Sequence, residues 1–246
     1  MSRFLALSYG VLCYAFFFVV FLYAIGFVGG VGVPKGIDDG RAASLPAALL
    51  IDALLLAVFA VQHSVMARPA FKAMWTRIVP APVERSTYVL FSSLALALVY
   101  WQWRPIVQPV IWQATMPWLV ILLWVLFALG WLIVFVSTFL ISHFDLFGLS
   151  QVWAFARRRE PHELEFTTPF FYKAVRHPIY LGFIVAFWAT PKMTLGHLVF
   201  AVATTAYMLI AVQFEERDLV AQFGERYLKY RASVSMIVPW LPGRSG

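Results

Sequence analysis

The chain has 246 residues, of which 62% are hydrophobic, 17% aromatic and 13% charged, and its formal net charge is +7. With a mean hydropathy of +0.79, this composition excludes an ordinary soluble domain and predicts an all-α polytopic membrane protein, an integral helical bundle. The excess of cations does not call for nucleic acid, because cations beside a membrane meet anionic lipid headgroups.

Apolar runs long enough to cross a hydrocarbon core of about 30 Å predict four spanning helices, over residues 4–28, 45–66, 87–103 and 118–141. A fifth run, residues 179–189, is too short by itself, but Pro191 and Lys192 turn the chain into the longer run 195–214. These last two segments predict a helical hairpin. We therefore expect about six membrane helices and a cytoplasmic C-terminal cap.

The Lys and Arg residues are unevenly divided between the two sides of these predicted helices. With the N-terminus in the cytoplasm, 15 of the 19 lie on the cytoplasmic side and 4 on the other. This split follows the positive-inside rule. It predicts a multi-pass protein of the lipid bilayer with both termini in the cytoplasm.

Two polar clusters bracket the predicted hairpin. The first is the run Arg176-His177-Pro178-Ile179-Tyr180-Leu181-Gly182, and the second is Glu215-Glu216, with Tyr227 and Tyr230 following. Because the arms of a hairpin are antiparallel, we expect the clusters to meet at one membrane edge. His177 lies where a helix begins and backbone N–H groups are unpaired, which suits a carboxylate, and the glutamates suit an amine or sulfonium. The pattern therefore favours a site for a zwitterionic, cationic ligand.

Together with Thr168-Pro169, Tyr172 and Phe223-Gly224, these clusters resemble the C-terminal half of the isoprenylcysteine carboxyl methyltransferase superfamily, membrane enzymes that use S-adenosylmethionine. The resemblance implies that the chain binds S-adenosyl-L-methionine and releases S-adenosyl-L-homocysteine. It also implies ten cofactor-binding residues: Tyr172, Arg176, His177, Pro178, Tyr180, Gly182, Glu215, Glu216, Tyr227 and Tyr230.

Segments elsewhere in the chain are similar to the bacterial methanethiol S-methyltransferases. They are Gln62-His63-Ser64-Val65-Met66-Ala67-Arg68-Pro69, Val83-Glu84-Arg85-Ser86-Thr87-Tyr88, Phe144-Asp145-Leu146-Phe147-Gly148-Leu149 and Ala186-Phe187-Trp188-Ala189-Thr190-Pro191-x-Met193-Thr194-x-Gly196-His197-Leu198. The resemblance implies an S-methyltransferase of the bacterial inner membrane that converts a small volatile thiol, methanethiol, to dimethyl sulfide. It fits a chain in which no large soluble domain is predicted to receive a protein substrate.

Methyl transfer from a sulfonium to sulfur is an in-line displacement by a thiolate, so a base or a cation must help an acceptor that is mostly protonated. The candidate catalytic residues are expected at one depth, at the cytoplasmic ends of the earlier helices: His63, Arg85, Tyr88, His143 and Asp145. His63 or His143 would take the proton, directly or through water, and Arg85 and Tyr88 would stabilise the thiolate. As alternatives, Arg85 anchors its helix at the headgroups, and His143 and Asp145 cap theirs.

Other functions stay open at this point. The same superfamily contains methyltransferases for lipid or prenyl thiols, and a non-enzymatic membrane protein like NnrU carries a similar His-Ser pair. Metal is not expected, because the histidines show no ligand spacing and Cys13 is the only cysteine. No glycine fingerprint follows a strand, so helices must bind any adenosyl cofactor. We expect one membrane domain over residues 1–246, with a four-helix part (1–141) and a cofactor-binding part (142–246).

Overall fold

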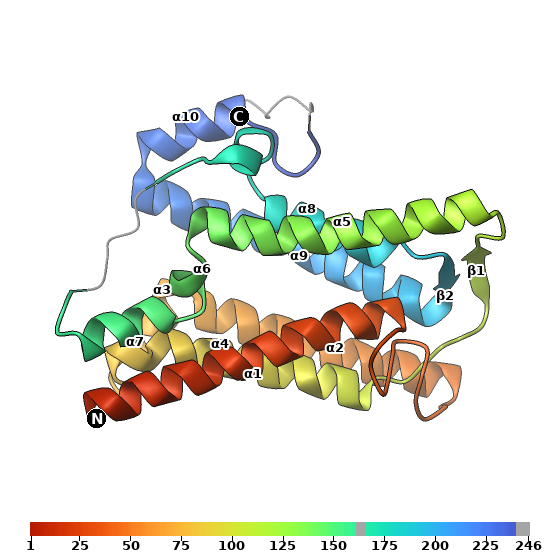
Figure 1. The fold of residues 1–246 in the computed structure, drawn as a ribbon, viewed down its shortest axis with the longest axis horizontal. Helices are drawn as coiled ribbons and strands as arrows, with labels where there is room; N and C mark the ends of the chain where they lie inside the picture. Colours follow the sequence, from red (N-terminus) through yellow and green to blue (C-terminus); the bar gives the residue numbers. More distant parts are fainter. Residues whose placement is uncertain (161–165, 240–246) are drawn as a thin grey trace. The chain divides into compact units, whose positions relative to one another are not determined.

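The structure, a computed structural model, describes residues 1–160 and 166–239 (Figure 1). Helices dominate, and the described strands form one small two-stranded sheet, which confirms the predicted all-α class. The elements in chain order are α1 (Arg3–Gly29), α2 (Leu45–Ala67), α3 (Pro69–Trp75), α4 (Ala81–Gln102), β1 (Val110–Gln113), α5 (Pro117–Ile141), α6 (His143–Leu146), α7 (Leu149–Ala156), η1 (Phe170–Lys173), α8 (Pro178–Trp188), β2 (Lys192–Thr194), α9 (Leu195–Phe223) and α10 (Glu225–Ser233).

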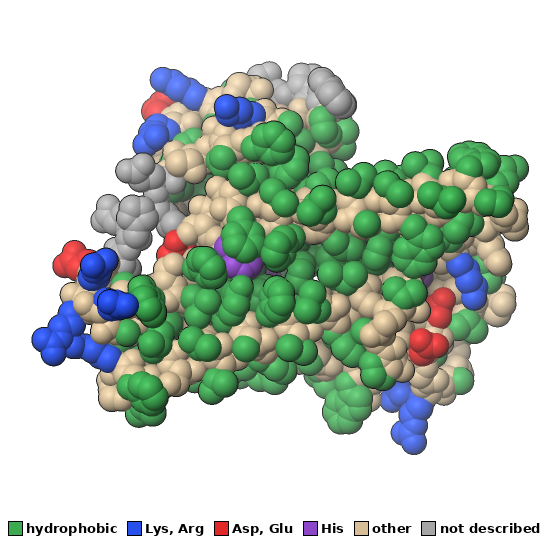
Figure 2. All heavy atoms as spheres, in the orientation of Figure 1, with side chains coloured by type: hydrophobic (Ala, Val, Ile, Leu, Met, Phe, Trp, Pro, Cys, Tyr) green, Lys and Arg blue, Asp and Glu red, His purple; other side chains and the backbone are tan. Residues whose placement is uncertain are grey.

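Four of the described helices, α1, α2, α5 and α9, are long and apolar enough to cross a membrane. Hydrophobic side chains cover much of the face seen in Figure 2, whereas Lys and Arg gather near α7 and α10. Such apolar surface suits contact with lipid and confirms the membrane class. α4 has 22 residues but is less apolar, and α8 has 11 residues, a length of about 16 Å. The six crossings therefore stay a prediction.

The second arm of the hairpin is longer than the apolar run that predicts it. α9 continues beyond Phe214 to Phe223 because no proline or glycine interrupts the chain before Gly224, whose φ is +55°. Glu215 and Glu216 consequently lie inside a continuous helix rather than after its end. The helix therefore fixes the backbone positions from which both carboxylates project.

The chain divides into two compact units, and each is described by itself. The first comprises Met1–Pro109, His143–Glu163 and Thr194–His197. In it α1 packs against α4 and α7, and α2 packs against α4. A Cβ added at Gly10 would lie 2.5 Å from the side chain of Val152, so the glycine permits the close approach of α1 and α7. This packing places the start of α4 beside the segment that follows Ser142.

The second unit comprises Val110–Ser142, Leu164–Met193 and Leu198–Gly246. α5 and α8 pack closely in it, and a Cβ at Gly182 would lie 2.6 Å from the carbonyl oxygen of Gly130. After α10 the backbone pairs with the segment before α8: Arg176 N donates to Ser235 O at 2.8 Å, and His177 N donates to Met236 O at 3.1 Å. The chain that follows α10 therefore fixes the start of α8.

Candidate functional site

The centre of the polar cluster in the second unit is the buried carboxylate of Glu216 on α9, which is 7% exposed. Arg176 Nε donates to its Oε1 at 2.7 Å, and Nε2 of the buried His177 lies 3.1 Å from the same oxygen. A charge taken out of water is tolerated only when it is paired and hydrogen-bonded. The carboxylate of Glu216 is thus already paired with two side chains of the protein.

Arg176 holds several elements of the second unit together. Besides Glu216, its guanidinium binds two carbonyls where α10 ends, donating to Arg231 O at 2.9 Å and to Val234 O. All three partners lie far along the chain from Arg176. The arginine therefore acts as a tie between α9, the end of α10 and the start of α8.

The neighbouring carboxylate of Glu215 is in a different state, because its side chain is 43% exposed. Tyr180 OH donates to its Oε2 at 2.8 Å, and His177 Nδ1 lies 3.9 Å from that oxygen. The rings of His177 and Tyr180 are stacked, with centroids 5.6 Å apart. Glu215 is therefore oriented on one side and open on the other, as a carboxylate that receives a cationic ligand should be.

Three tyrosines surround this cluster with differing contacts. Tyr230 OH donates to Tyr172 O at 2.5 Å, and Tyr172 OH donates to Ser137 O at 3.4 Å. Both hydroxyls are therefore hydrogen-bonded to backbone carbonyls. The buried hydroxyl of Tyr227 has no well-aligned partner among the described residues. Burial, reinforced by the negative charge of Glu216, raises the pKa of Tyr227 far above its usual range. Its proton stays in place, and the hydroxyl can donate to a ligand.

Pro178 and Gly182 have structural roles that the geometry makes clear. Pro178 is the first residue of α8, where its missing N–H costs nothing. Gly182 faces Gly130 at a distance that excludes a side chain. The two residues set where α8 starts and how closely it packs, and a role in cofactor binding stays a prediction for both.

A second cluster lies in the first unit around His63 on α2. The hydroxyl of the buried Tyr88 is 3.0 Å from Nε2 and 3.1 Å from Nδ1 of His63, and Ser92 Oγ is 3.1 Å from Nδ1. The ring of Phe59 stacks on the imidazole at 5.2 Å. The structure thus brings His63 and Tyr88 together, as expected, and holds the imidazole in one orientation.

Arg85 belongs to the same cluster and is fixed from two sides. Its Nε donates to Leu146 O at 2.8 Å, and its guanidinium carbon lies 5.0 Å from the centre of the Tyr88 ring. These contacts place a cation beside the phenol, in addition to any contact with headgroups. A positive charge at that position favours the ionised form of a nearby thiol.

His143 and Asp145 lie in the short helix α6. His143 is buried, and its Nε2 is 2.8 Å from Tyr14 OH on α1. Burial lowers the pKa of His143, so the ring is neutral at physiological pH and one nitrogen can accept a proton. The backbone carbonyl of Asp145 accepts from Gln151 Nε2 at 3.2 Å, which ties α6 to α7.

Ser92 belongs to this cluster, although the sequence pattern did not single it out. A signal for it exists, because Arg85, Tyr88 and Ser92 follow each other at spacings of three and four and so share one face of α4. A serine within an apolar helix carries no signal of its own. Among the described residues, no group of three or more His, Cys, Asp or Glu side chains could hold a metal ion.

Comparisons with known proteins give a consistent result. The family model described as NnrU protein matches residues 51–238. A methanethiol S-methyltransferase of Crocosphaera subtropica is 55% identical over 245 residues, covering 100% of this chain and 96% of its own length. That of Mycobacterium tuberculosis is 54% identical over 240 residues, covering 98% of both chains. Nurim of Mus musculus is 33% identical over 194 residues, which are 76% of this chain and 71% of nurim. No solved structure matches the chain.

Proposed function

The chain belongs to the NnrU protein family and to the family of the methanethiol S-methyltransferases, and we propose that it methylates methanethiol with S-adenosylmethionine as the donor. The products are dimethyl sulfide, S-adenosylhomocysteine and one proton. The observation that carries the cofactor assignment is the exposed, oriented carboxylate of Glu215 beside the buried Arg176–Glu216 pair.

The residues of the second unit fit the charges of S-adenosylmethionine. When bound, this cofactor supplies a methyl group made electrophilic by its sulfonium. Glu215 is the carboxylate for its ammonium or sulfonium charge, since Glu216 is engaged by Arg176 and His177. The stacked rings of His177 and Tyr180 offer an aromatic face to a cation. The buried hydroxyl of Tyr227, which has no well-aligned partner among the described residues, is a donor that a polar ligand would satisfy.

The residues of the first unit fit the acceptor side of the reaction. The S–H proton passes to a ring nitrogen of His63, which Ser92 and Tyr88 hold in place. Arg85, fixed by the carbonyl of Leu146, stabilises the negative charge left on sulfur. His143 is the second candidate base, since its neutral ring also has the capacity to accept a proton. We further propose that the protein lies in the bacterial inner membrane with both termini in the cytoplasm.

The test combines ligand-induced stabilisation with product detection. S-adenosylhomocysteine should raise the melting temperature of the purified protein, because it binds only the folded form. Membranes given methanethiol and S-adenosylmethionine should release dimethyl sulfide into the headspace. Absence of both effects would refute the proposal, and methylation of a long-chain thiol without dimethyl sulfide would assign another acceptor.

Two matched variants test the role of Glu215. Glu215→Gln should raise the Kd for S-adenosylhomocysteine at least about tenfold, as expected when a charge-assisted contact is lost. Glu225→Gln, which changes an exposed carboxylate in the first turn of α10, should leave that Kd unchanged. Equal effects of the two changes would remove Glu215 from the site.

A further inference from the structure

Phe147 lies in the turn between α6 and α7, and both of its neighbours in the chain are held by α4. The carbonyl oxygen of Leu146 accepts from Arg85 Nε at 2.8 Å, and that of Gly148 accepts from Ser86 Oγ at 3.3 Å. Gly148 has a φ of +86°, and a Cβ on it would lie 2.7 Å from the backbone nitrogen of Ser86. The turn is therefore fixed against α4, which sets where the ring of Phe147 lies.

The ring of Phe147 contacts the surroundings of both candidate bases. Its centroid lies 4.9 Å from that of His143, in an edge-to-face arrangement. The same side chain packs against the buried cluster that contains Tyr88, and Tyr88 OH is hydrogen-bonded to the imidazole of His63. Phe147 thus borders the region beside either base in which an activated thiol must place its carbon atoms.

Two more apolar side chains form a wall with Phe147. Phe17 on α1 stacks on its ring with centroids 3.9 Å apart, and Met66 on α2 belongs to the cluster against which both rings pack. Gln62 Nε2 lies 3.1 Å from Met66 Sδ and so restrains the thioether. Aromatic rings and thioethers make favourable contacts with sulfur and methyl groups, but they cannot replace the water lost by a carboxylate, an ammonium or a hydroxyl. The wall therefore favours an acceptor without polar substituents.

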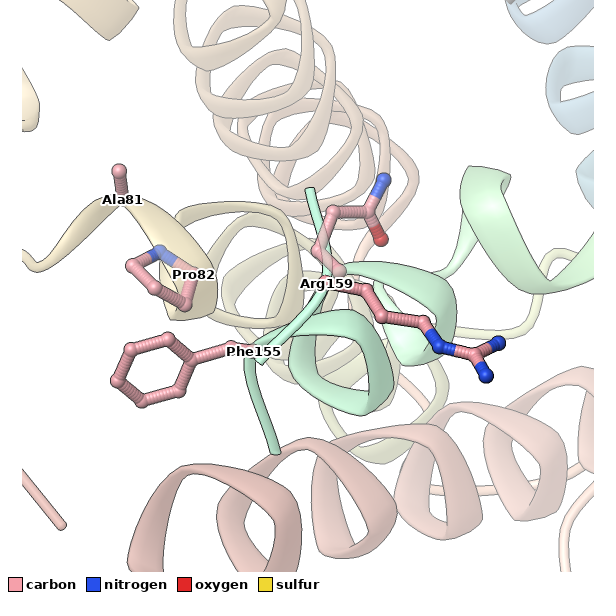
Figure 3. A pocket seen from close by; sticks show the side chains of 5 residues that line it. Ala81, Pro82, Phe155 and Arg159 are labelled. Atoms are coloured by element: carbon pink, nitrogen blue, oxygen red, sulfur yellow. The ribbon is translucent and has the colours of Figure 1, made fainter. Parts of the chain in front are cut away.

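A hollow in the same unit shares no lining residue with this wall. It has a volume of about 160 Å³, lies between the start of α4 and α7, and is lined by Ala81, Pro82, Gln151, Phe155 and Arg159, none of which is a candidate catalytic residue. Figure 3 shows Phe155 beside Pro82 at this hollow. Phe155 is therefore a phenylalanine of the same unit whose loss should loosen the packing without changing the wall.

We propose that Phe147 limits the length of the thiol that the protein methylates, with Phe17 and Met66 completing the wall. This inference rests on the proposed function, because it takes the acceptor sulfur to lie beside Arg85 and its methyl group to lie against the ring of Phe147. Each further carbon must push against a ring whose turn is held on both sides. The acceptors are therefore short alkanethiols without polar substituents.

The first experiment measures kcat/KM of the purified full chain with S-adenosylmethionine and each of three thiols, by detecting the thioether formed. Wild-type kcat/KM should fall at least about tenfold from methanethiol to 1-propanethiol, as for an apolar site that must accommodate added methylene groups. It should be lower still for 2-mercaptoethanol, which has nearly the length of 1-propanethiol but carries a hydroxyl. Equal values for methanethiol and 1-propanethiol overturn the role of the wall in length, and a better rate with 2-mercaptoethanol overturns its apolar selectivity.

The second experiment changes the size of the ring. Phe147→Ala should raise the ratio of kcat/KM for 1-propanethiol to that for methanethiol at least about tenfold, and Phe147→Leu should raise it by a smaller factor. Phe147→Leu carries the test if the alanine variant does not fold. An unchanged ratio overturns the proposal. Loss of turnover with every thiol while S-adenosylhomocysteine still binds also overturns it, because a ring that only limits length is not needed for methanethiol.

The matched control is Phe155→Ala, which removes the same ring from the hollow of Figure 3. Its ratio should equal that of the wild type, and a shift as large as that of Phe147→Ala would assign the effect to general loosening and overturn the proposal. The wild type separates this inference from the proposed function. A wild type that methylates none of the thiols refutes the proposed function, whereas one that makes dimethyl sulfide, with a ratio that Phe147 variants do not change, refutes only the role of Phe147.

Discussion

Nε of Arg176 lies 2.7 Å from Oε1 of Glu216, and the two side chains are only 7% and 9% exposed. The pair joins the segment before α8 to the last third of α9 and leaves the adjacent Glu215 partly open to solvent. Two consecutive carboxylates thus differ in their surroundings: Glu216 is buried in an ion pair, and Glu215, for which we propose a role in ligand binding, is partly exposed. This division gives each of them its own experimental signature.

Glu216→Gln should destabilise the protein by about 3–5 kcal/mol, because the guanidinium of Arg176 stays buried without its counter-charge. The loss is measured as a fall in the melting temperature without ligand. The double variant Arg176→Met with Glu216→Leu should recover much of it, since no charge remains buried. A single variant as stable as the wild type would contradict a buried ion pair.

Tyr180→Phe removes the hydroxyl that orients Glu215 and leaves the ring stacked on His177. We expect the Kd for S-adenosylhomocysteine to rise about threefold to tenfold. This factor corresponds to the loss of one hydrogen bond to a charged group when water partly takes the place of the lost hydroxyl. Isothermal titration measures the change, and the melting temperature of the free protein should stay nearly constant. A large fall in that temperature would instead show that the hydroxyl stabilises the folded protein.

Ser92→Ala removes the side chain bound to Nδ1 of His63. Because Ser92 positions His63 and does not touch the reacting atoms, Ser92→Ala should lower kcat about tenfold. The loss expected for His63→Ala is larger, about 100-fold or more. The pH profile of kcat should shift, and Ser92→Thr should restore both rate and profile because it keeps the hydroxyl. An unchanged pH profile with a lower rate would indicate a packing role alone.

Much of the C-terminal cluster could be predicted from sequence, because a hairpin joined by Pro191 and Lys192 must bring its two outer ends to the same edge. The pairing of Arg176 with Glu216 rather than with a ligand could not. It depends on the chain after α10 reaching back to residues 175–177. That contact joins distant parts of the chain and is made by backbone groups, so no pattern of residue types predicts it.

The length of α9 shows a related limit. Hydropathy predicts its end at Phe214, where apolar residues give way to charges, but a helix ends where its backbone cannot continue, at Gly224. The His63 cluster shows the opposite case. His63, Arg85 and Tyr88 could be predicted to meet because they lie at the facing ends of two helices. Ser92 could not, because serine is a common residue that does not by itself indicate a site.

Gly182→Ala tests the close packing of α5 and α8. The new methyl group would lie 2.6 Å from Gly130 O, a backbone atom that cannot move aside cheaply, so the cost should be about 1–3 kcal/mol or more. Thermal unfolding measures it. Gly196→Ala, where the nearest heavy atom is at 3.0 Å, should cost less, and the reverse order would contradict the packing described.

The buried His143 should make the protein sensitive to mild acid. Its folded-state pKa lies below the ordinary value of about 6.5, so the unfolded chain takes up the proton first. The stability that the neutral ring contributes is complete above the ordinary pKa and is lost as the pH falls below it. His143→Gln should therefore reduce the fall in melting temperature between pH 7.5 and 5.5. Tyr14→Phe removes the partner hydroxyl but keeps the titrating ring, so it should retain most of the fall. If His143→Gln retains the wild-type slope, other groups dominate the acid response, and burial of this imidazole does not control it.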